Sequence, residues 1–240
     1  MSQTALLEAA GLHTYYGASH VLRGVDLTIR PGESVGLLGR NGMGKTTTIR
    51  SILGLTPPRR GKVTLDGRPV TGAPPHTIAR RGVALVPEGR GIFPNLTVRE
   101  NLTMGARPAP PDSPAEDWAL DRVLTLFPPL GERLDTWGNL LSGGQQQMLS
   151  MGRALMTNPR LLILDEATEG LAPQVRNEIW SVVRAIKDAG IATLIVDKDL
   201  KTMLRVCDHC VILAKGQVVY AGPASALAAD PEIHVRFLGI

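Results

Sequence analysis

The sequence predicts an α/β protein with a doubly wound sheet, whose faces are both covered by helices. Apolar runs without interruption have the composition of strands that are buried on both faces, as in a parallel sheet. These runs are SVGLLG (34–39), GVALVP (82–87), LLILDE (161–166) and ATLIVD (192–197). Helical patterns lie between them, at about 45–54, 143–157 and 173–189. Strands that alternate with helices in this way are typical of a doubly wound core.

Two further regions are expected beside this core. Residues 21–29 alternate apolar and polar side chains before a turn at Pro31-Gly32, and VTLDG (63–67) ends in an Asp-Gly turn. Both patterns indicate an antiparallel subdomain with one exposed face. Between 87 and 161 no strong strand pattern occurs, and the segment contains helix-like stretches and the proline-rich RPAPPDSPAED (107–117). We interpret it as an inserted helical subdomain with a flexible connection.

The expected organisation is therefore a single domain over 1–240. Its α/β core and antiparallel subdomain would comprise 1–87 and 158–222. The helical subdomain would comprise 88–157, and 223–240 would form a C-terminal tail. A chain of 240 residues with 43% hydrophobic and 20% charged residues can build one such domain with a full core.

Composition argues against several classes of function. The net charge is only +4, from 26 basic and 22 acidic residues, and the doublets Arg59–Arg60 and Arg80–Arg81 suit a solvated surface. We therefore expect no nucleic acid partner. No apolar run approaches the ~18 residues of a membrane-spanning helix, and the start MSQTALLEAAG lacks the features of a secretion signal. The expectation is a cytoplasmic protein that reaches the membrane only through a partner.

The two cysteines, Cys207 and Cys210, leave two interpretations open. A C-x-x-C pair can be redox-active or half of a zinc site, although no second ligand pair follows it. The alternative is two small apolar residues where a helix gives way to the strand that begins at Val211.

A phosphate-binding loop follows the first buried strand. Residues 39–46, GRNGMGKT, fit the pattern G-x-x-x-x-G-K-[ST] between a strand and a helix. The glycines Gly39, Gly42 and Gly44 allow backbone N–H groups to face a phosphate. Lys45 is expected to reach the β- and γ-phosphates, and Thr46 to offer an oxygen to Mg²⁺. The neighbouring Asn41 and Thr47 are included in the predicted ATP site.

The strand LLILDE provides acidic groups for the same chemistry. It delivers Asp165 to the carboxyl end of a strand, where α/β sheets bind ligands. Asp165 is expected to hold Mg²⁺, and Glu166 to polarise the attacking water as a general base.

A second anion-binding element is LSGGQ, residues 141–145. Ser142, Gly143, Gly144 and Gln145 open a predicted helix whose N–H donors face outward. With these motifs the chain resembles the nucleotide-binding subunits of ATP-binding cassette (ABC) transporters, nearly from end to end. The resemblance implies a P-loop NTPase core with a mixed sheet and a head-to-tail dimer, homomeric or heteromeric. In that dimer each LSGGQ closes on the ATP that the other subunit's P-loop holds.

The resemblance assigns further residues. Tyr16 matches the aromatic residue that stacks on adenine, although Tyr15 stands beside it. Glu88, in VPEGRGIFPNLTVREN, falls where most of the family has a glutamine that contacts the metal and the water. A glutamate there keeps an oxygen ligand for Mg²⁺. The resemblance implies that the same loop relays movement to the transmembrane permease.

Two segments depart from the family pattern. Lys198 replaces a histidine that contacts the γ-phosphate, and ATEGL (167–171) replaces the usual Pro-Ser and Leu-Asp. Lys198 would either perform a similar electrostatic task or mark a site that hydrolyses ATP slowly, with turnover supplied by a partner ATPase. The third alternative is a lysine that points to solvent.

The segments VPEGR, IFPNLTVREN and GRALMTNPRLLILDE resemble the smaller ATP-binding subunit of branched-chain (hydrophobic) amino acid importers. That resemblance implies ATP-driven import with a permease and, indirectly, a periplasmic solute-binding protein, on the inner face of the cell membrane. The competing classes are a nucleotide-gated binding module with weak hydrolysis, an ABC ATPase that acts on DNA or ribosomes, and a P-loop kinase of small molecules.

Overall fold

The computed structural model describes residues 4–109 and 117–239. It contains a six-stranded sheet in the order β10-β9-β3-β8-β7-β6. Strands β6 to β9 and β3 run parallel, and only β10 is antiparallel to its neighbour. The strands are β3 (Ser34–Leu38), β6 (Val83–Val86), β7 (Leu161–Asp165), β8 (Ala192–Val196), β9 (His209–Ala214) and β10 (Gln217–Pro223). The buried strands predicted from apolar runs are thereby confirmed.

A second, four-stranded antiparallel sheet in the order β2-β1-β4-β5 packs beside the first. Its strands are β1 (Leu7–Tyr16), β2 (Ser19–Ile29), β4 (Arg60–Leu65) and β5 (Arg68–Pro69). Asp66 and Gly67 both have positive φ, 49° and 70°, as expected for the tight Asp-Gly turn between β4 and β5. The predicted antiparallel sheet is therefore present.

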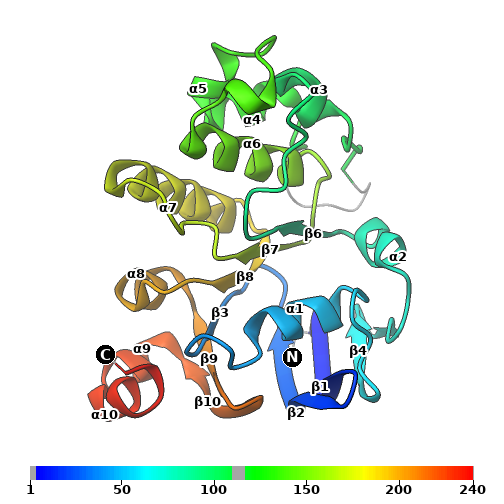
Figure 1. The fold of residues 1–240 in the computed structure, drawn as a ribbon, viewed down its shortest axis with the longest axis vertical. Coiled ribbons are helices and arrows are strands. Elements are labelled where there is room, and N and C mark those ends of the chain that lie inside the picture. The colour runs from blue at the N-terminus through cyan, green and yellow to red at the C-terminus, as the bar shows by residue number, and fades with distance from the viewer. Residues whose placement is uncertain (1–3, 110–116, 240) are drawn as a thin grey trace.

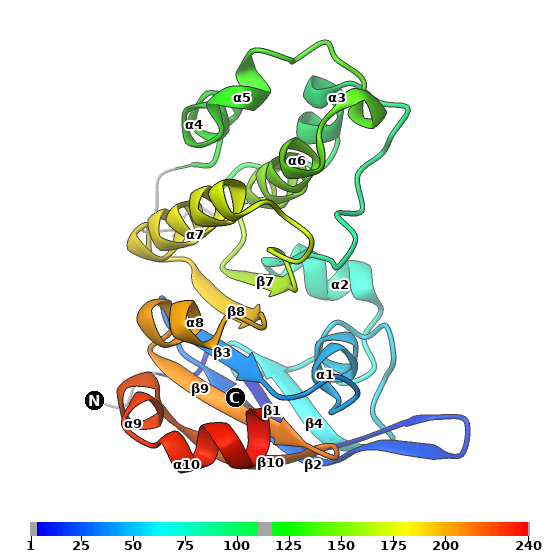
Figure 2. The same cartoon turned by 60° about the vertical axis from the view of Figure 1, so that its left-hand side comes forward.

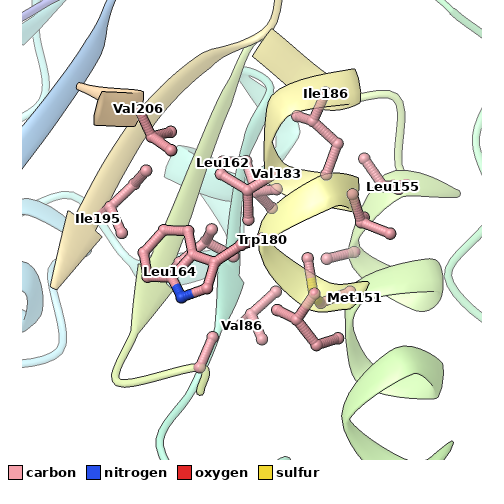
Figure 3. Packing of buried hydrophobic residues seen from close by; sticks show 14 of the residues in the cluster. Val86, Met151, Leu155, Leu162, Leu164, Trp180, Val183, Ile186, Ile195 and Val206 are labelled. Carbon is pink, nitrogen blue, oxygen red and sulfur yellow. The ribbon is translucent and has the colours of Figure 1, made fainter. Parts of the chain in front are cut away.

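Helices cover both faces of the six-stranded sheet. Successive residues of β7 point in opposite directions, so Leu162 and Leu164 join one apolar core while Leu161 and Ile163 join the other. The first core is closed by α6 (Gly143–Leu155), α7 (Pro173–Asp188) and α8 (Leu200–Val206). In Figure 3, Trp180 and Val183 of α7 project toward the strands, and Met151 and Leu155 of α6 belong to the same cluster. The second core is closed by α1 (Lys45–Ile52), α2 (Pro75–Arg80) and the antiparallel sheet.

The segment between β6 and β7 forms a helical region at the end of the molecule opposite β1 and β2 (Figure 1). It contains α3 (Val98–Thr103), α4 (Leu120–Leu126), α5 (Pro128–Gly131), the 3₁₀ turn η1 (Gly138–Leu140) and α6. Most of the proline-rich stretch 107–117 lies outside the described residues. The chain ends with α9 (Ala224–Ala228), α10 (Pro231–Ile233) and the π-helical η2 (His234–Leu238), which lie together beside β9 and β10 (Figure 2).

Both cysteines are free and buried where α8 leads into β9. A Cβ atom on Gly36 of the adjacent strand β3 would lie 3.1 Å from Sγ of Cys207 and 3.3 Å from Sγ of Cys210. The thiols therefore fill space between α8 and the sheet, as the apolar interpretation of the pair expects. No helix among the described residues is long and apolar enough to cross a membrane.

Candidate nucleotide-binding site

The sheet topology gathers the predicted site at one edge. Strands β3, β6, β7 and β8 are parallel, so the loops that follow them emerge at the same end of the sheet. The loop after β3 is the glycine-rich segment 39–44, and Glu88 follows β6. Asp165 ends β7 and pairs with Val196 in β8, which places Glu166 and Lys198 beside each other just past the strand ends.

The loop after β3 follows a path that only glycine permits. Gly39 has φ 142°, and a Cβ there would lie 2.5 Å from the carbonyl oxygen of Leu213. Gly44 has φ 106° and is the N-cap of α1, with no side chain bonded to the first turn of the helix. The first N–H groups of α1 are thus left for a ligand, which suits an anion at a helix N-terminus.

Lys45 points back into the curve of this loop. Its Nζ donates hydrogen bonds to the carbonyl oxygens of Gly39, at 2.8 Å, and of Arg40, at 3.3 Å. Burial lowers the pKa of Lys45, while the carboxylates of Glu166 and Asp165 act in the opposite direction. The ammonium group is therefore held inside the curve of the glycine-rich loop, as a phosphate-binding lysine requires.

A pocket of about 420 Å³ brings the loops together. It is lined by Tyr16, Val21, Asn41, Gly42, Gly44, Lys45, Thr46, Thr47, Glu88, Glu166, Glu169 and Lys198. Nearly all the residues predicted to bind ATP at the P-loop thus share one cavity. Val21 was not predicted; it packs behind the loop, with its Cγ1 3.9 Å from where a Cβ on Gly44 would lie.

The structure distinguishes the two adjacent tyrosines. Tyr16 lines the pocket and is 45% exposed. Tyr15 instead stacks on His20, with ring centroids 4.2 Å apart, and lies 4.4 Å below the guanidinium carbon of Arg59. Only Tyr16 therefore presents a free aromatic face to the pocket, which suits a base-stacking role.

A set of oxygens that fits Mg²⁺ lies at the end of β7. Asp165 is only 4% exposed and accepts a hydrogen bond from the hydroxyl of Thr46. Its Oδ1 atom has no hydrogen-bond partner among the described residues. Burial raises the pKa of Asp165, and the nearby carboxylate of Glu88 raises it further. A buried carboxylate oxygen without a donor, next to a hydroxyl and a second carboxylate, is a donor set that a hard divalent cation satisfies.

Glu166 is held in a strained conformation by its neighbours. Its φ of 52° is unusual for a residue with a side chain, and its N–H donates to the carbonyl of Val196 at 2.9 Å. The pKa of Glu166 is raised to about 7. The larger cause is a hydrogen bond with Glu169, and the second is burial. Lys198 lies 3.7 Å away and opposes this rise. A pKa near neutrality suits a group that accepts a proton at physiological pH.

The predicted LSGGQ element lies outside this pocket. Ser142 is the N-cap of α6, with its hydroxyl accepting from the N–H of Gln145 at 3.3 Å, and the Gln145 side chain accepts from the Ser142 N–H at 3.1 Å. This reciprocal pair is a capping box. None of residues 142–145 lines the cavity that holds the P-loop. Within one chain the structure therefore brings together the P-loop, Asp165, Glu166, Glu88 and Lys198, but not the start of α6.

Packing explains the two glycines that open α6. A Cβ on Gly143 would lie 2.8 Å from a guanidinium nitrogen of Arg90, and one on Gly144 would lie 2.6 Å from Cγ1 of Val175. Arg90 also donates to Oε1 of Gln146 at 3.0 Å, so it joins the loop after Glu88 to the start of α6. The sequence analysis missed Arg90. The only local signal for this residue is that it lies between two glycines, Gly89 and Gly91.

The comparisons with known proteins agree with this geometry. The family model described as ABC transporter matches residues 22–169. The chain belongs to the ABC transporter ATP-binding family. It is 37% identical over 226 residues to "High-affinity branched-chain amino acid transport ATP-binding protein BraG" of Pseudomonas aeruginosa, which covers 94% of this chain and 96% of that protein. It is 34% identical over 237 residues to "Lipopolysaccharide export system ATP-binding protein LptB" of Escherichia coli K12, covering 98% of each chain.

A solved structure described as "Structure of ATP binding subunit of ABC transporter" aligns with this ABC chain at a TM-score of 0.82 and 32% identity. The alignment covers 98% of this chain and 96% of the other. The predicted ABC ATPase fold is thereby confirmed. As a member of this family the chain is an ATP-binding ATPase subunit of a transporter, and its hydrolysis of ATP powers transport. Proteins of this kind form dimers and work with transmembrane permease subunits.

Proposed function

We propose that this ATPase powers the import of branched-chain, hydrophobic amino acids on the inner face of the cell membrane. Relatives named for branched-chain amino acid transport support the solute, with BraG at 37% identity and LivF of Archaeoglobus fulgidus at 32%. LptB and a Nod factor export protein of Cupriavidus metallidurans match at similar identity, 34% and 36%. The proposal therefore needs a test that separates amino acid import from export.

The proposed reaction is hydrolysis of the β–γ bond of ATP. The adenine stacks on Tyr16, and the phosphates lie against the backbone N–H groups of 39–44, with Asn41 and Thr47 at the rim of the pocket. Lys45 neutralises the β- and γ-phosphates. Thr46, Asp165 and Glu88 would hold Mg²⁺, whose charge would stabilise the negative charge that develops during phosphoryl transfer. Glu166 orients and deprotonates the attacking water.

The observation that carries the mechanism is the separation of two anion-binding elements. The P-loop and Glu166 share one pocket, whereas Ser142, Gly143, Gly144 and Gln145 begin a helix outside it. Both helix starts can bind the same triphosphate only if they come from different subunits. We therefore propose a head-to-tail dimer, with itself or with a second ABC ATPase subunit, in which Ser142 of one subunit meets the γ-phosphate held by its partner.

Residues 88–157 form the proposed helical subdomain, and the permease is proposed to dock where this subdomain meets the core. A groove of about 300 Å³ there is lined by Leu85 of β6, by Phe93 and Met104, and by Arg153 of α6. Phe93 and Met104 are 43% and 54% exposed, although both are apolar. An apolar helix of the permease would cover them. Because Phe93 is on the loop that begins at Glu88, movement at the γ-phosphate would reach the groove directly.

The test is reconstitution of the chain with its permease in proteoliposomes and a periplasmic solute-binding protein. We expect leucine-loaded receptor to stimulate ATP hydrolysis and leucine to accumulate on the side that holds the ATPase. Glu166→Gln should bind ATP, lose hydrolysis and accumulate as a closed dimer, and Lys45→Ala should lose ATP binding. If leucine does not stimulate hydrolysis but a lipopolysaccharide substrate does, the proposed solute and the proposed direction of transport are both wrong. The assignment of ATPase activity would still stand.

A further inference from the structure

Three charged side chains meet where the loops after β7 and β8 run side by side. Nζ of Lys198 lies 3.7 Å from Oε2 of Glu166 and forms a hydrogen-bonded ion pair with Oε1 of Glu169. Carboxylate oxygens of Glu166, Glu169 and Glu88 all lie within 4.8 Å of one another. The single ammonium group of Lys198 therefore bridges two carboxylates that would otherwise repel each other.

The sheet register produces this contact. Asp165 pairs with Val196, so the residue after one strand and the second residue after the other emerge at the same level. Glu169 then returns to Glu166 through a tight turn, in which the Glu169 N–H donates to the Glu166 carbonyl at 3.1 Å. A second tie joins the same two loops, because Oγ1 of Thr168 donates to Oδ2 of Asp197 at 2.5 Å.

Exposure separates the roles of the three residues. The side chain of Glu166 is 14% exposed, whereas Lys198 and Glu169 are 54% and 45% exposed. The pair Glu169–Lys198 thus forms the outer wall of the pocket against which the Glu166 side chain rests. Glu169 and Lys198 both lie at positions where the sequence departs from the family pattern. The two unusual residues therefore pair with each other.

We propose that Glu169 and Lys198 act as one positioning unit for Glu166: their ion pair sets the direction in which the carboxylate of the proposed base faces the γ-phosphate. Lys198 then acts on the reaction through Glu166, and does not serve mainly as a ligand of the γ-phosphate. The inference rests on the proposed role of Glu166 in ATP hydrolysis and adds Glu169, which the sequence analysis did not identify.

The test is a double-mutant cycle on the full chain with its permease. Lys198→Ala and Glu169→Ala should each lower kcat ~10-fold and leave the KM for ATP within ~2-fold, because the ground-state contacts to ATP are unchanged. The double variant should lose ~10-fold rather than ~100-fold, since both changes remove the same interaction. Lys198→Arg keeps the charge and should restore most of kcat, and the charge swap Glu169→Lys with Lys198→Glu should be more active than either swap alone.

Controls make each outcome informative. Lys201→Ala, an exposed lysine on α8, should behave like the wild type. Thermal unfolding of every variant shows whether it is folded, and the conservative Lys198→Arg and Glu169→Gln variants carry the test if an alanine variant is not. Additive losses in the double variant, unchanged kcat in both single variants, or a loss of ATP affinity relative to ADP in Lys198→Ala alone would each overturn the positioning unit. Glu166→Gln in the same assay tests the base separately: if that variant still hydrolyses ATP, the proposed function itself fails.

Discussion

At the scale of single residues, the proposed hydrolysis of ATP depends on Glu166, whose backbone conformation is unfavourable and is maintained by its neighbours. Glu166 has a left-handed backbone, with φ 52°, and comes directly after β7, which is buried on both faces. The hydrogen bond from its N–H to the carbonyl of Val196 fixes the turn. Strain of this kind costs ~1–3 kcal/mol and persists only where the surroundings determine it. The side chain that results faces two carboxylates and two ammonium groups within one pocket.

The titration of Glu166 should reveal this environment. The hydrogen bond that the protonated Glu166 carboxyl donates to Glu169 is the main reason that the pKa of Glu166 is raised to about 7 from 4.5, so in the nucleotide-free chain Glu166 is protonated below neutral pH and charged above it. Glu169→Ala should lower the midpoint toward 4.5, because the raising partner is lost while Lys198 remains. Carboxyl ¹³C chemical shifts recorded against pH measure both midpoints. An identical midpoint in the two proteins would contradict the assignment of the shift to Glu169.

At the scale of elements, α6 has two separable tasks at its N-terminus. Ser142 caps the helix through Gln145, and its exposed position also makes it the proposed contact to a partner's γ-phosphate. Both tasks use the same end of the helix, where unpaired N–H groups and the helix dipole attract anions. A substitution that keeps the cap and introduces a negative charge can therefore distinguish them.

We predict different outcomes for Ser142→Ala and Ser142→Asp. The alanine variant loses the cap and should reduce the free energy of unfolding by ~1 kcal/mol. The aspartate variant keeps a good cap and should change stability by less than ~0.5 kcal/mol, yet its carboxylate would repel a triphosphate. Both proteins are compared in a Glu166→Gln background by light scattering with ATP. The protein that retains Ser142 should be a dimer, and the protein that carries Ser142→Asp should be a monomer. Dimers of equal stability in both would remove Ser142 from the interface.

The elements that the sequence predicted correctly are those with an unbroken pattern. The strands β3, β7 and β8 were recognised because burial on both faces makes each an uninterrupted apolar run. The helices α1, α6 and α7 were recognised because buried residues recur along one face of each. Strand β1 was not predicted, because register shifts between Ala9 and Leu12 and between Thr14 and Tyr15 interrupt its alternation. Glu169 was missed for a different reason: only the pairing of β7 with β8 brings it to Lys198, and no local pattern records that pairing.

At the scale of the whole molecule, the nucleotide pocket and the groove beside Phe93 are connected by a short stretch of chain. Glu88 lines the pocket, Arg90 holds the start of α6, and Gly91 accepts a hydrogen bond from Arg153 at 2.6 Å. The ring centroid of Phe93 lies 5.1 Å from the guanidinium carbon of Arg153. The backbone N–H and carbonyl of Phe93 form hydrogen bonds with the side chain of the buried Asn101. One loop thus contacts the nucleotide, the helix that begins at Gly143 and the proposed permease groove.

This arrangement predicts that coupling and hydrolysis can be separated by a change in the groove alone. Met104→Asp places a charge on an apolar residue that is 54% exposed, in the groove but away from the residues that line the nucleotide pocket. Burying that charge under an apolar permease helix would cost several kcal/mol, so docking should weaken by ~100-fold or more. The purified variant should keep its ATPase rate, whereas stimulation by the permease and receptor should disappear. Met104→Leu is the matched control, because it keeps the apolar surface and should couple normally. Full stimulation of the aspartate variant would place the permease on another face of the chain.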